Sequence, residues 1–390
     1  MRRGVGQRGS MTLGALLGCA AIVAACGFDG VGQIDPSAGG ADSGVPSEGS
    51  TTDRSASPSD ASDESILLGD GSTSCVADLA TDPSNCGRCA HSCAGAACVA
   101  GKCQPVTLAT GNRPHEVTVD ATDVYWTDRG TAIAAPGVAR CPKAGGTVVP
   151  VATGSVGTAD PTSVAVQSGR AVFTDATFNS VVSCGLPGPG CSDQQSTTES
   201  GPQGITTNGA ALFWVNGNSG NVRRGDAALS SPLTVAQNQI GLSRVAANAT
   251  TVFFTVLNGV GSAPVGGGAG AVSFANGMTA RDIAIDATYV YVAYATEVRR
   301  LTHAFAGEMV VATGGDIQRL AVDASGIYFT DRGAANGRIL RCPVVGCTVS
   351  QPAEVLATGE AMPFGVALDA THVYWANEPA SGGTIRRVAK

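Results

Sequence analysis

Residues 114–128, PHEVTVDATDVYWTD, decide the fold because the same phrase returns six more times along the chain. Each copy contains an apolar triplet, a short turn and then a pair of hydrophobic or aromatic residues. The other copies are residues 161–175, 202–216, 242–256, 280–294, 317–331 and 363–377. Because matching positions recur at intervals of 37 to 47 residues, the sequence predicts seven structural repeats.

Each repeat is predicted to form four short strands. In the first repeat, residues 116–120 alternate along one strand, a tight turn follows, and residues 124–128 form the second strand. Residues 137–142 and 147–154 supply the third and fourth strands. A period of two, with no long stretch of period 3.6, excludes a helix-rich fold. Four-stranded units of about 40 residues are typical of propellers, so we expect an all-β, seven-bladed β-propeller over residues 106–390.

The two ends of this region are predicted to meet in one blade. The last repeat stops after its third strand, at residues 384–388. Residues 106–111, VTLATG, match the fourth-strand endings of other repeats at 151–154, 311–314 and 356–359. We therefore expect residues 106–111 to complete the last blade and to close the ring.

The aromatic pairs carry a resemblance to known propellers. Residues 124–128 (VYWTD), 328–331 (YFTD) and 374–377 (YWAN) resemble the blade motif of YWTD and NHL-type propellers, and more broadly the group with SMP-30-like lactonases and streptogramin lyase. Receptor-type YWTD propellers have six blades, whereas this chain has seven repeats, so the resemblance extends to the blade motif and not to that family's ring or ligands. We expect the aromatic pairs to pack between blades.

The N-terminus is predicted to direct export. Arginines precede an apolar run at residues 11–25, which has the length of a signal-peptide core. Residues 23–26 (VAAC) resemble a bacterial lipobox, so residues 1–25 are assigned to a lipoprotein signal peptide and Cys26 to the lipidated residue. Residues 16–19 also fit a lipobox but leave a shorter apolar core, and an ordinary cleaved signal with an incidental cysteine is the other alternative. The protein is expected to be exported and lipid-anchored to the cell envelope, at the outer membrane or facing the periplasm.

Charge and composition limit the classes of partner that we expect for this protein. The 390 residues include 53 Gly and only 14% charged residues, against roughly 25% in ordinary globular chains. The net charge of the chain is −7, and residues 26–74, a Gly/Ser/Asp-rich stretch expected to be a disordered linker, carry −8, so the rest of the chain is nearly neutral. This balance argues against nucleic acid as a partner and leaves the lipid anchor as the only expected membrane contact. We expect a monomer.

Six cysteines gather in residues 75–105 and predict a small disulfide-rich module. They are Cys75, Cys86, Cys89, Cys93, Cys98 and Cys103. Three disulfides are expected, with the connectivity left open. The alternative is a zinc site, because His91 lies among cysteines with metal-like spacing. The pattern NCGxCxxxC resembles a module of myxobacterial secreted proteins and lipoproteins, a resemblance that implies no activity.

Five cysteines remain in the propeller region. Cys184 and Cys191, and likewise Cys342 and Cys347, bracket Gly/Pro-rich turns and are expected to form local disulfides. Cys141 has no such partner. It is either a reactive thiol or a buried, inert strand residue, and we favour the buried residue because no His or cation pair is visible beside it.

Candidate binding residues lie where the chain enters the first strand of each repeat, because propellers usually bind ligands at the channel mouth. They are His115, Glu116, Gln203, Arg244, Arg281, Asp282 and Arg319. Arginines at such a mouth can hold an anionic ligand through bidentate contacts. The alternative is a hydrated channel lined by paired charges. The leading prediction is a binding or scaffolding module for a protein or a small anionic ligand, with no cofactor and no catalytic residue.

The family resemblance implies an enzymatic alternative, a metal-dependent lyase or lactonase. It would use His115, Glu116 and Asp282, with a divalent cation as cofactor. Glu116 and Asp282 are the only carboxylates that the sequence places at this mouth, and His372 is expected in a solvent-exposed turn. No nucleophile elbow, HExxH motif or phosphate-binding loop is present in the sequence.

Overall fold

The computed structural model describes residues 78–131, 135–153, 160–268, 270–333 and 336–390, all within one compact unit, Ser65–Lys390. These residues form strands and no helix, so within these ranges no helix is long and apolar enough to cross a membrane. The predicted signal peptide, Cys26, the linker 26–74 and Cys75 lie outside the described residues.

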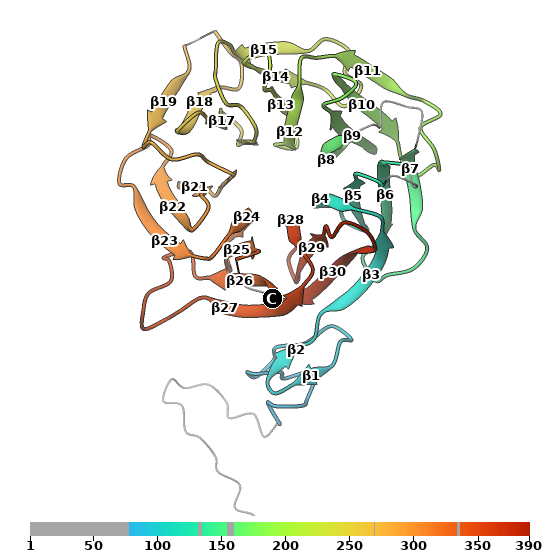
Figure 1. The fold of residues 1–390 in the computed structure, drawn as a ribbon, viewed down its shortest axis with the longest axis vertical. Helices are drawn as coiled ribbons and strands as arrows, with labels where there is room; N and C mark the ends of the chain where they lie inside the picture. Colours follow the sequence, from blue (N-terminus) through green and yellow to red (C-terminus); the bar gives the residue numbers. More distant parts are fainter. Residues whose placement is uncertain (1–77, 132–134, 154–159, 269, 334–335) are drawn as a thin grey trace, which may run out of the picture. The chain divides into compact units, whose positions relative to one another are not determined.

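Seven antiparallel four-stranded sheets surround a central channel, which confirms the predicted seven-bladed β-propeller (Figure 1). The innermost strands of blades 1 to 7 are β4 (Pro114–Val119), β8 (Pro161–Gln167), β12 (Pro202–Thr207), β16 (Val245–Ala247), β20 (Asp282–Ile285), β24 (Ile317–Asp323) and β28 (Pro363–Leu368). The second strands are β5 (Asp123–Asp128), β9 (Arg170–Asp175), β13 (Leu212–Asn216), β17 (Thr251–Val256), β21 (Tyr289–Ala293), β25 (Gly326–Asp331) and β29 (His372–Asn377).

The outer half of each blade follows the same order. The third strands are β6 (Gly137–Pro142), β10 (Ser180–Gly185), β14 (Asn221–Gly225), β18 (Gly259–Pro264), β22 (Glu297–Thr302), β26 (Gly337–Cys342) and β30 (Gly383–Ala389). The outermost strands are β7 (Val149–Thr153), β11 (Gln195–Thr198), β15 (Leu233–Ala236), β19 (Val272–Ala275), β23 (Met309–Thr313), β27 (Glu354–Glu360) and β3 (Val106–Gly111).

Blade 7 is built from both ends of the propeller region, as predicted. Its strand order is β28-β29-β30-β3, and β3 pairs with β30 in antiparallel register, from Val106 opposite Arg387 to Gly111 opposite Gly383. Leu108 and Ala109 of β3 are buried. The N-terminal strand therefore supplies the outer strand of the last blade and closes the ring.

The aromatic pairs pack between blades because successive side chains of a strand point to opposite faces. In β5, Trp126 packs against Tyr374 and other residues of blade 7, whereas Tyr125 packs against Val164 and other residues of blade 2. The Tyr125 hydroxyl also donates a hydrogen bond to Asp120 in the preceding turn, at 2.7 Å. The two aromatic side chains thus join one blade to both of its neighbours.

The last residue of the second strand is Asp in three blades and Asn in two, and the two residue types make different contacts. Asp128 accepts hydrogen bonds from the backbone N–H groups of Asn112, Arg113 and Gly130, which lie in the surrounding loops. Asn377 instead donates its side-chain amide to the buried Glu360 of the preceding blade, at 2.6 Å. The Asn residues therefore mark buried polar contacts between blades.

Two local disulfides hold loops against the outer edge of a neighbouring blade. They join Cys184 to Cys191 and Cys342 to Cys347. The backbone N–H of Cys347 donates to the oxygen of Val311 in β23 at 2.7 Å, so this loop covers part of an outermost strand. Covering exposed strand edges limits pairing with other chains.

The Cys-rich module contains a small sheet of β1 (Cys98–Val99) and β2 (Lys102–Cys103). Its disulfides include Cys86–Cys98 and Cys93–Cys103, and Cys89 is also disulfide-bonded. His91 contacts the backbone oxygens of Cys86 and Lys390, both at 2.6 Å. The cysteines of the zinc alternative are thus engaged in disulfides.

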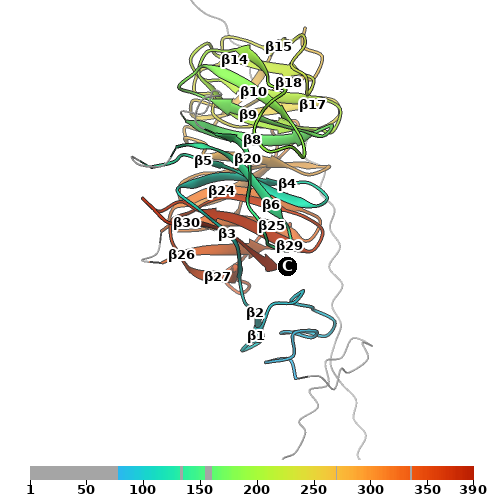
Figure 2. The same ribbon diagram turned by 90° about the vertical axis from the view of Figure 1, so that its right-hand side faces the viewer.

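The module lies next to β3 at the outer edge of the ring, as both ribbon views show (Figures 1 and 2). Its buried cysteines share one apolar cluster with Trp375, Val388 and Ala389 of blade 7. It therefore packs on the blade that closes the ring.

Cys141 is the buried, inert residue that the sequence favoured. Among the described cysteines it is the one without a disulfide, and its side chain is fully buried in β6. Burial raises the pKa of the thiol to about 11, with a smaller contribution from the negative charge of Asp123. The thiol therefore stays protonated near neutral pH, which disfavours nucleophilic reactivity.

Candidate functional site

A bulge at the start of the innermost strands shapes the channel. In blade 1, Pro114 pairs with Asp128 but the next pair is Val117 with Trp126, so His115 and Glu116 fall outside the regular ladder. Similar irregularities occur in blades 2, 3, 6 and 7. A β-bulge re-aims side chains, and here it frees two residues of the strand from sheet pairing.

In every repeat, one residue stands immediately before the first aliphatic residue of the innermost strand, and it has the same place in all seven blades. These seven residues are Glu116, Ser163, Gly204, Arg244, Asp282, Arg319 and Gly365. The second-strand threonine anchors this position, since Thr127 Oγ1 accepts the N–H of Glu116 at 3.0 Å and Thr330 Oγ1 accepts that of Arg319 at 3.1 Å. The repeat therefore places one residue from each blade in a ring around the channel, and the type of this residue differs between blades.

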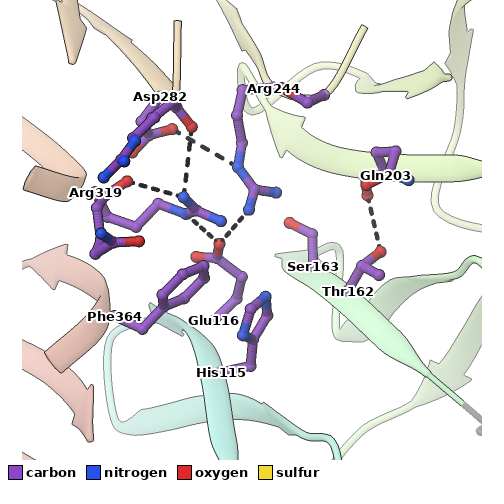
Figure 3. A network of polar contacts seen from close by, with 12 residues as sticks. His115, Glu116, Thr162, Ser163, Gln203, Arg244, Asp282, Arg319 and Phe364 are labelled. Atoms are coloured by element: carbon purple, nitrogen blue, oxygen red, sulfur yellow. Dashed lines mark hydrogen bonds and ion pairs between the residues drawn. The ribbon is translucent and has the colours of Figure 1, made fainter. Parts of the chain in front are cut away.

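Four of these residues form what we call the channel cluster: Glu116, Arg244, Asp282 and Arg319. Oε1 of Glu116 forms an ion pair with Nη2 of Arg244 at 2.8 Å and accepts a hydrogen bond from Nε of Arg319 at 2.5 Å (Figure 3). Oδ1 of Asp282 lies 4.0 Å from Nε of Arg244, and its Oδ2 accepts the backbone N–H of Leu320 at 2.9 Å. Glu116 therefore joins blade 1 to blades 4 and 6 across the channel.

Phe364 provides an aromatic surface beside the cluster. The Arg319 guanidinium carbon lies 3.9 Å from the centre of its ring, and the His115 imidazole stacks on Phe364 with 4.0 Å between ring centres. Cations bind favourably over aromatic faces. These contacts hold Arg319 and His115 in defined positions beside Glu116 (Figure 3).

His115 is bonded to a carboxylate that sequence reasoning missed. Its Nδ1 lies 3.0 Å from Oε2 of Glu378, and both residues are buried. Burial alone would raise the pKa of Glu378, but the hydrogen bond from His115 and the nearby positive charges outweigh it, so the pKa lies below its usual value. Glu378 is ionised at neutral pH, so Nδ1 of His115 is the donor.

Three arginines surround the same Glu378 carboxylate. Nη2 of Arg113 and Nη2 of Arg332 lie 3.2 Å and 3.3 Å from it, and Nη1 of Arg129 lies 3.8 Å away. Arg129, Arg332 and Glu378 each follow the last residue of a second strand, in the adjacent blades 1, 6 and 7. That shared repeat position is the signal that could have identified this group.

Asp282 is the perturbed acid of the channel cluster. Burial raises its pKa to about 7, while the charge of Arg244 lowers it and that of Glu116 raises it. Because the pKa of Asp282 is raised, its carboxyl group offsets the positive charge of Arg244 less completely than an ordinary carboxylate would.

We expect Asp282→Asn to stabilise the protein more at pH 8 than at pH 5. The folded pKa lies above the value of about 3.9 in the unfolded chain, so the folded state retains a proton that the unfolded chain loses between about pH 4 and pH 7. Wild-type stability therefore falls as pH rises through that window, and the amide removes this loss. The melting-temperature difference, variant minus wild type, should increase by roughly 5 °C from pH 5 to pH 8.

Asp193→Asn is the matched control for this measurement. Backbone and Arg170 hydrogen bonds lower the pKa of this exposed carboxyl, so it is ionised in both states across that range. Its melting-temperature difference should stay constant. Parallel pH profiles for the two variants would show that burial does not perturb Asp282.

The remaining predicted residues lie outside the channel cluster. Nη1 of Arg281 binds Asp316 at 2.5 Å and the backbone oxygen of Ile317 at 2.8 Å, so its charge is directed to the rim. Gln203 contributes its backbone oxygen, which accepts a hydrogen bond from Thr162 at 3.3 Å. The expectation that all these side chains face one another is wrong for Arg281, because its guanidinium binds Asp316 and the backbone of Ile317 instead.

The expectation that His372 is solvent-exposed is also wrong. His372 is buried in β29, with 7% of its surface exposed, and its pKa is lowered chiefly by burial. Asp369 accepts its backbone N–H at 2.8 Å, so the turn ends one residue earlier than the polar sequence indicated.

A cavity of about 190 Å³ adjoins the channel cluster. Its walls include Glu116, Ser163, Arg244 and Asp282, followed by aliphatic residues of the innermost strands such as Leu320. At about 30 Å³ per water in the liquid, this volume corresponds to about six waters. The cavity is sized for a small molecule rather than for a polymer.

The residues of the metal-dependent alternative do not fit a divalent cation as arranged. His115 binds Glu378, whereas Glu116 bridges two arginines and Asp282 accepts a backbone N–H. Within the described ranges, the one group of three His, Cys, Asp or Glu ligand atoms within 4.8 Å of one another is Cys86, Cys93 and Cys103, all in disulfides.

No family model matches the sequence, and no curated protein is similar to it. A streptogramin B lyase structure is similar in fold, with TM-score 0.57 and 16% identity over 73% of this chain and 97% of that one. The WD40 repeats of RRP9 give TM-score 0.57 with 9% identity over 73% and 97% of the two chains. Hydrazine synthase from Kuenenia stuttgartiensis gives 0.55 with 16% identity over 70% and 95%. At these identities the comparisons show the propeller fold alone.

Proposed function

We propose that this protein is an exported, lipid-anchored module of the cell envelope whose propeller binds a small anionic ligand at the channel mouth. The proposal that the ligand is an anion rests on one observation. Three arginines at the rim share the single carboxylate of Glu378. Arg129 has a second partner in Asp160, at 2.7 Å, but Arg113 and Arg332 do not have another carboxylate among the described ion pairs. Guanidinium groups in excess over carboxylates favour an added anion.

Export and anchoring rest on the sequence and on the disulfides. The lipobox-like residues 23–26 support lipidation of Cys26, and disulfides persist in oxidising compartments outside the cytosol. Mass spectrometry of the native N-terminus should find a lipid-modified Cys26 as the first residue. An unmodified cysteine at this position would contradict the anchor.

Ligand binding is tested by calorimetry and thermal shift on the full chain with acetate, citrate, phosphate and sulfate, each against a neutral analogue. Anions should bind and raise the melting temperature, and Arg113→Gln should weaken binding about tenfold. Arg341→Gln, which removes an arginine paired with Glu354 on the outer strands of blade 6, should not change it. Equal effects of anions and neutral analogues would contradict an anion site.

A second candidate function is general-base catalysis, favoured by the His115–Glu378 pair. Nδ1 of His115 donates to Glu378, which leaves Nε2 as the nitrogen that can accept a proton, and the imidazole lies beside Glu116 and against Phe364 (Figure 3). The streptogramin B lyase structure with the same fold suggests the substrate to assay first. Turnover of streptogramin B that is lost in His115→Ala would support this candidate, and absence of turnover by the wild type would count against it.

A further inference from the structure

The channel cluster has the form of an occupied carboxylate site. A single oxygen of Glu116 forms ion pairs with Arg244 and Arg319, two arginines that come from different blades. The Arg319 side chain is buried and lies over Phe364. Nothing in the sheet pairing requires Glu116 there, because the bulge leaves it outside the ladder.

The donors of this site exceed its acceptors. Nε of Arg244 is buried and has no hydrogen-bond partner among the described residues. Asp282, which lies nearest to it, is 4.0 Å away and is bonded to a backbone N–H. A buried polar atom without a partner costs free energy, so the free protein holds an incompletely satisfied cation site.

The adjoining cavity limits what can bind. Glu116, Arg244 and Asp282 of the cluster line it together with residues of the innermost strands such as Val164 and Leu320, and the surface that these residues expose to the cavity is almost entirely polar. Its volume of about 190 Å³ accepts a small polar molecule next to Arg244. A small organic acid with few carbon atoms fits both features.

We propose that Arg244 and Arg319 form a carboxylate-binding site, that Glu116 occupies it in the free protein, and that the carboxylate of a short-chain organic acid takes its place. This inference goes beyond the proposed function, because Arg244 and Arg319 form a second site, separate from the arginines around Glu378, and it assigns that site one ligand class. The exchange replaces one carboxylate by another, so the charge in contact with the arginines is unchanged, and the Glu116 side chain turns toward the solvated channel.

The experiment measures binding of propionate by calorimetry and by thermal shift, with propionamide and phosphate as comparison ligands. Wild type should bind propionate in preference to both. Glu116→Gln has nearly the same shape but no charge, so propionate should bind it at least tenfold more tightly, because no internal carboxylate competes. Its melting temperature should be lower than wild type without ligand and should recover with propionate but not with propionamide.

Two further variants keep the test decisive. Arg319→Gln should abolish propionate binding, whereas Arg341→Gln, on the outer strands, should not alter it. If Glu116→Gln does not fold, Glu116→Asp retains the charge but is one methylene shorter and should also bind propionate more tightly than wild type.

The outcomes separate the two proposals. Anion binding that is lost in Arg113→Gln but is unchanged in the Glu116 variants would overturn this inference and leave an anion site at the rim. Preference for phosphate over propionate would overturn it in the same way. Failure of every anion to bind either wild type or Glu116→Gln would overturn both proposals.

Discussion

A chain that begins at Asn112 should melt at least about 10 °C below a chain that begins at Gln104. Both lack the Cys-rich module, but only the first lacks β3 (Val106–Gly111). Without β3, the third strand of blade 7 loses its partner and becomes an open edge, and the contacts of Leu108 with the core are lost. Losing one large buried aliphatic side chain costs about 2–5 kcal/mol, before the lost strand pairing is counted.

The open edge should also make the shorter chain associate. Differential scanning calorimetry gives the two melting temperatures, and light scattering detects association. If both chains melt within about 2 °C of each other and remain monomeric, β3 does not close the ring.

Replacing Glu360 by Ala should lower the free energy of unfolding by about 3–5 kcal/mol. This carboxylate, 2% exposed in blade 6, accepts from Trp375 Nε1 at 2.8 Å, from Asn377 at 2.6 Å and from Arg386 at 2.5 Å, all in blade 7. Its removal leaves a partly buried guanidinium and two buried donors without their acceptor. Glu360→Gln keeps one acceptor oxygen and should cost less.

Glu354→Ala is the matched control, because Glu354 lies on the same strand, β27, but about half of its side chain is exposed. Its ion pair with Arg341 should contribute less than about 1 kcal/mol. Chemical denaturation of the three variants gives the comparison. Similar losses for Glu360→Ala and Glu354→Ala would mean that the contacts between blades 6 and 7 contribute no more than a surface ion pair.

The fold could be predicted from the sequence because each blade is a local pattern repeated seven times. Strand alternation, the turn residues and the aromatic pair lie within one 15-residue phrase, and the match of residues 106–111 to other fourth strands identified the closing strand. Aligning the phrases also placed Glu116, Arg244 and Arg319 at one repeat position. Ring symmetry then brings them together, although Glu116 and Arg319 are 203 residues apart.

The rest of the site could not be predicted because side-chain direction depends on contacts between blades. Arg281 precedes Asp282 in the sequence, yet it turns to the rim, where Asp316 of the next blade binds it. Glu378 lies one residue beyond the repeated phrase, so the alignment did not include the residue that orients His115. The polar residues around His372 also led to the wrong prediction that it is exposed. Its burial comes from packing that the turn sequence does not encode.

The pairing of β3 with β30 has a consequence for how the protein folds. Blades 1 to 6 each pair strands that are neighbours in sequence, whereas blade 7 must pair Val106 with Arg387. Contacts between distant residues form slowly because a long chain loop must first be closed. We therefore expect ring closure to be the last step of folding, and its rate to set how long the two unpaired strand edges are available to another chain.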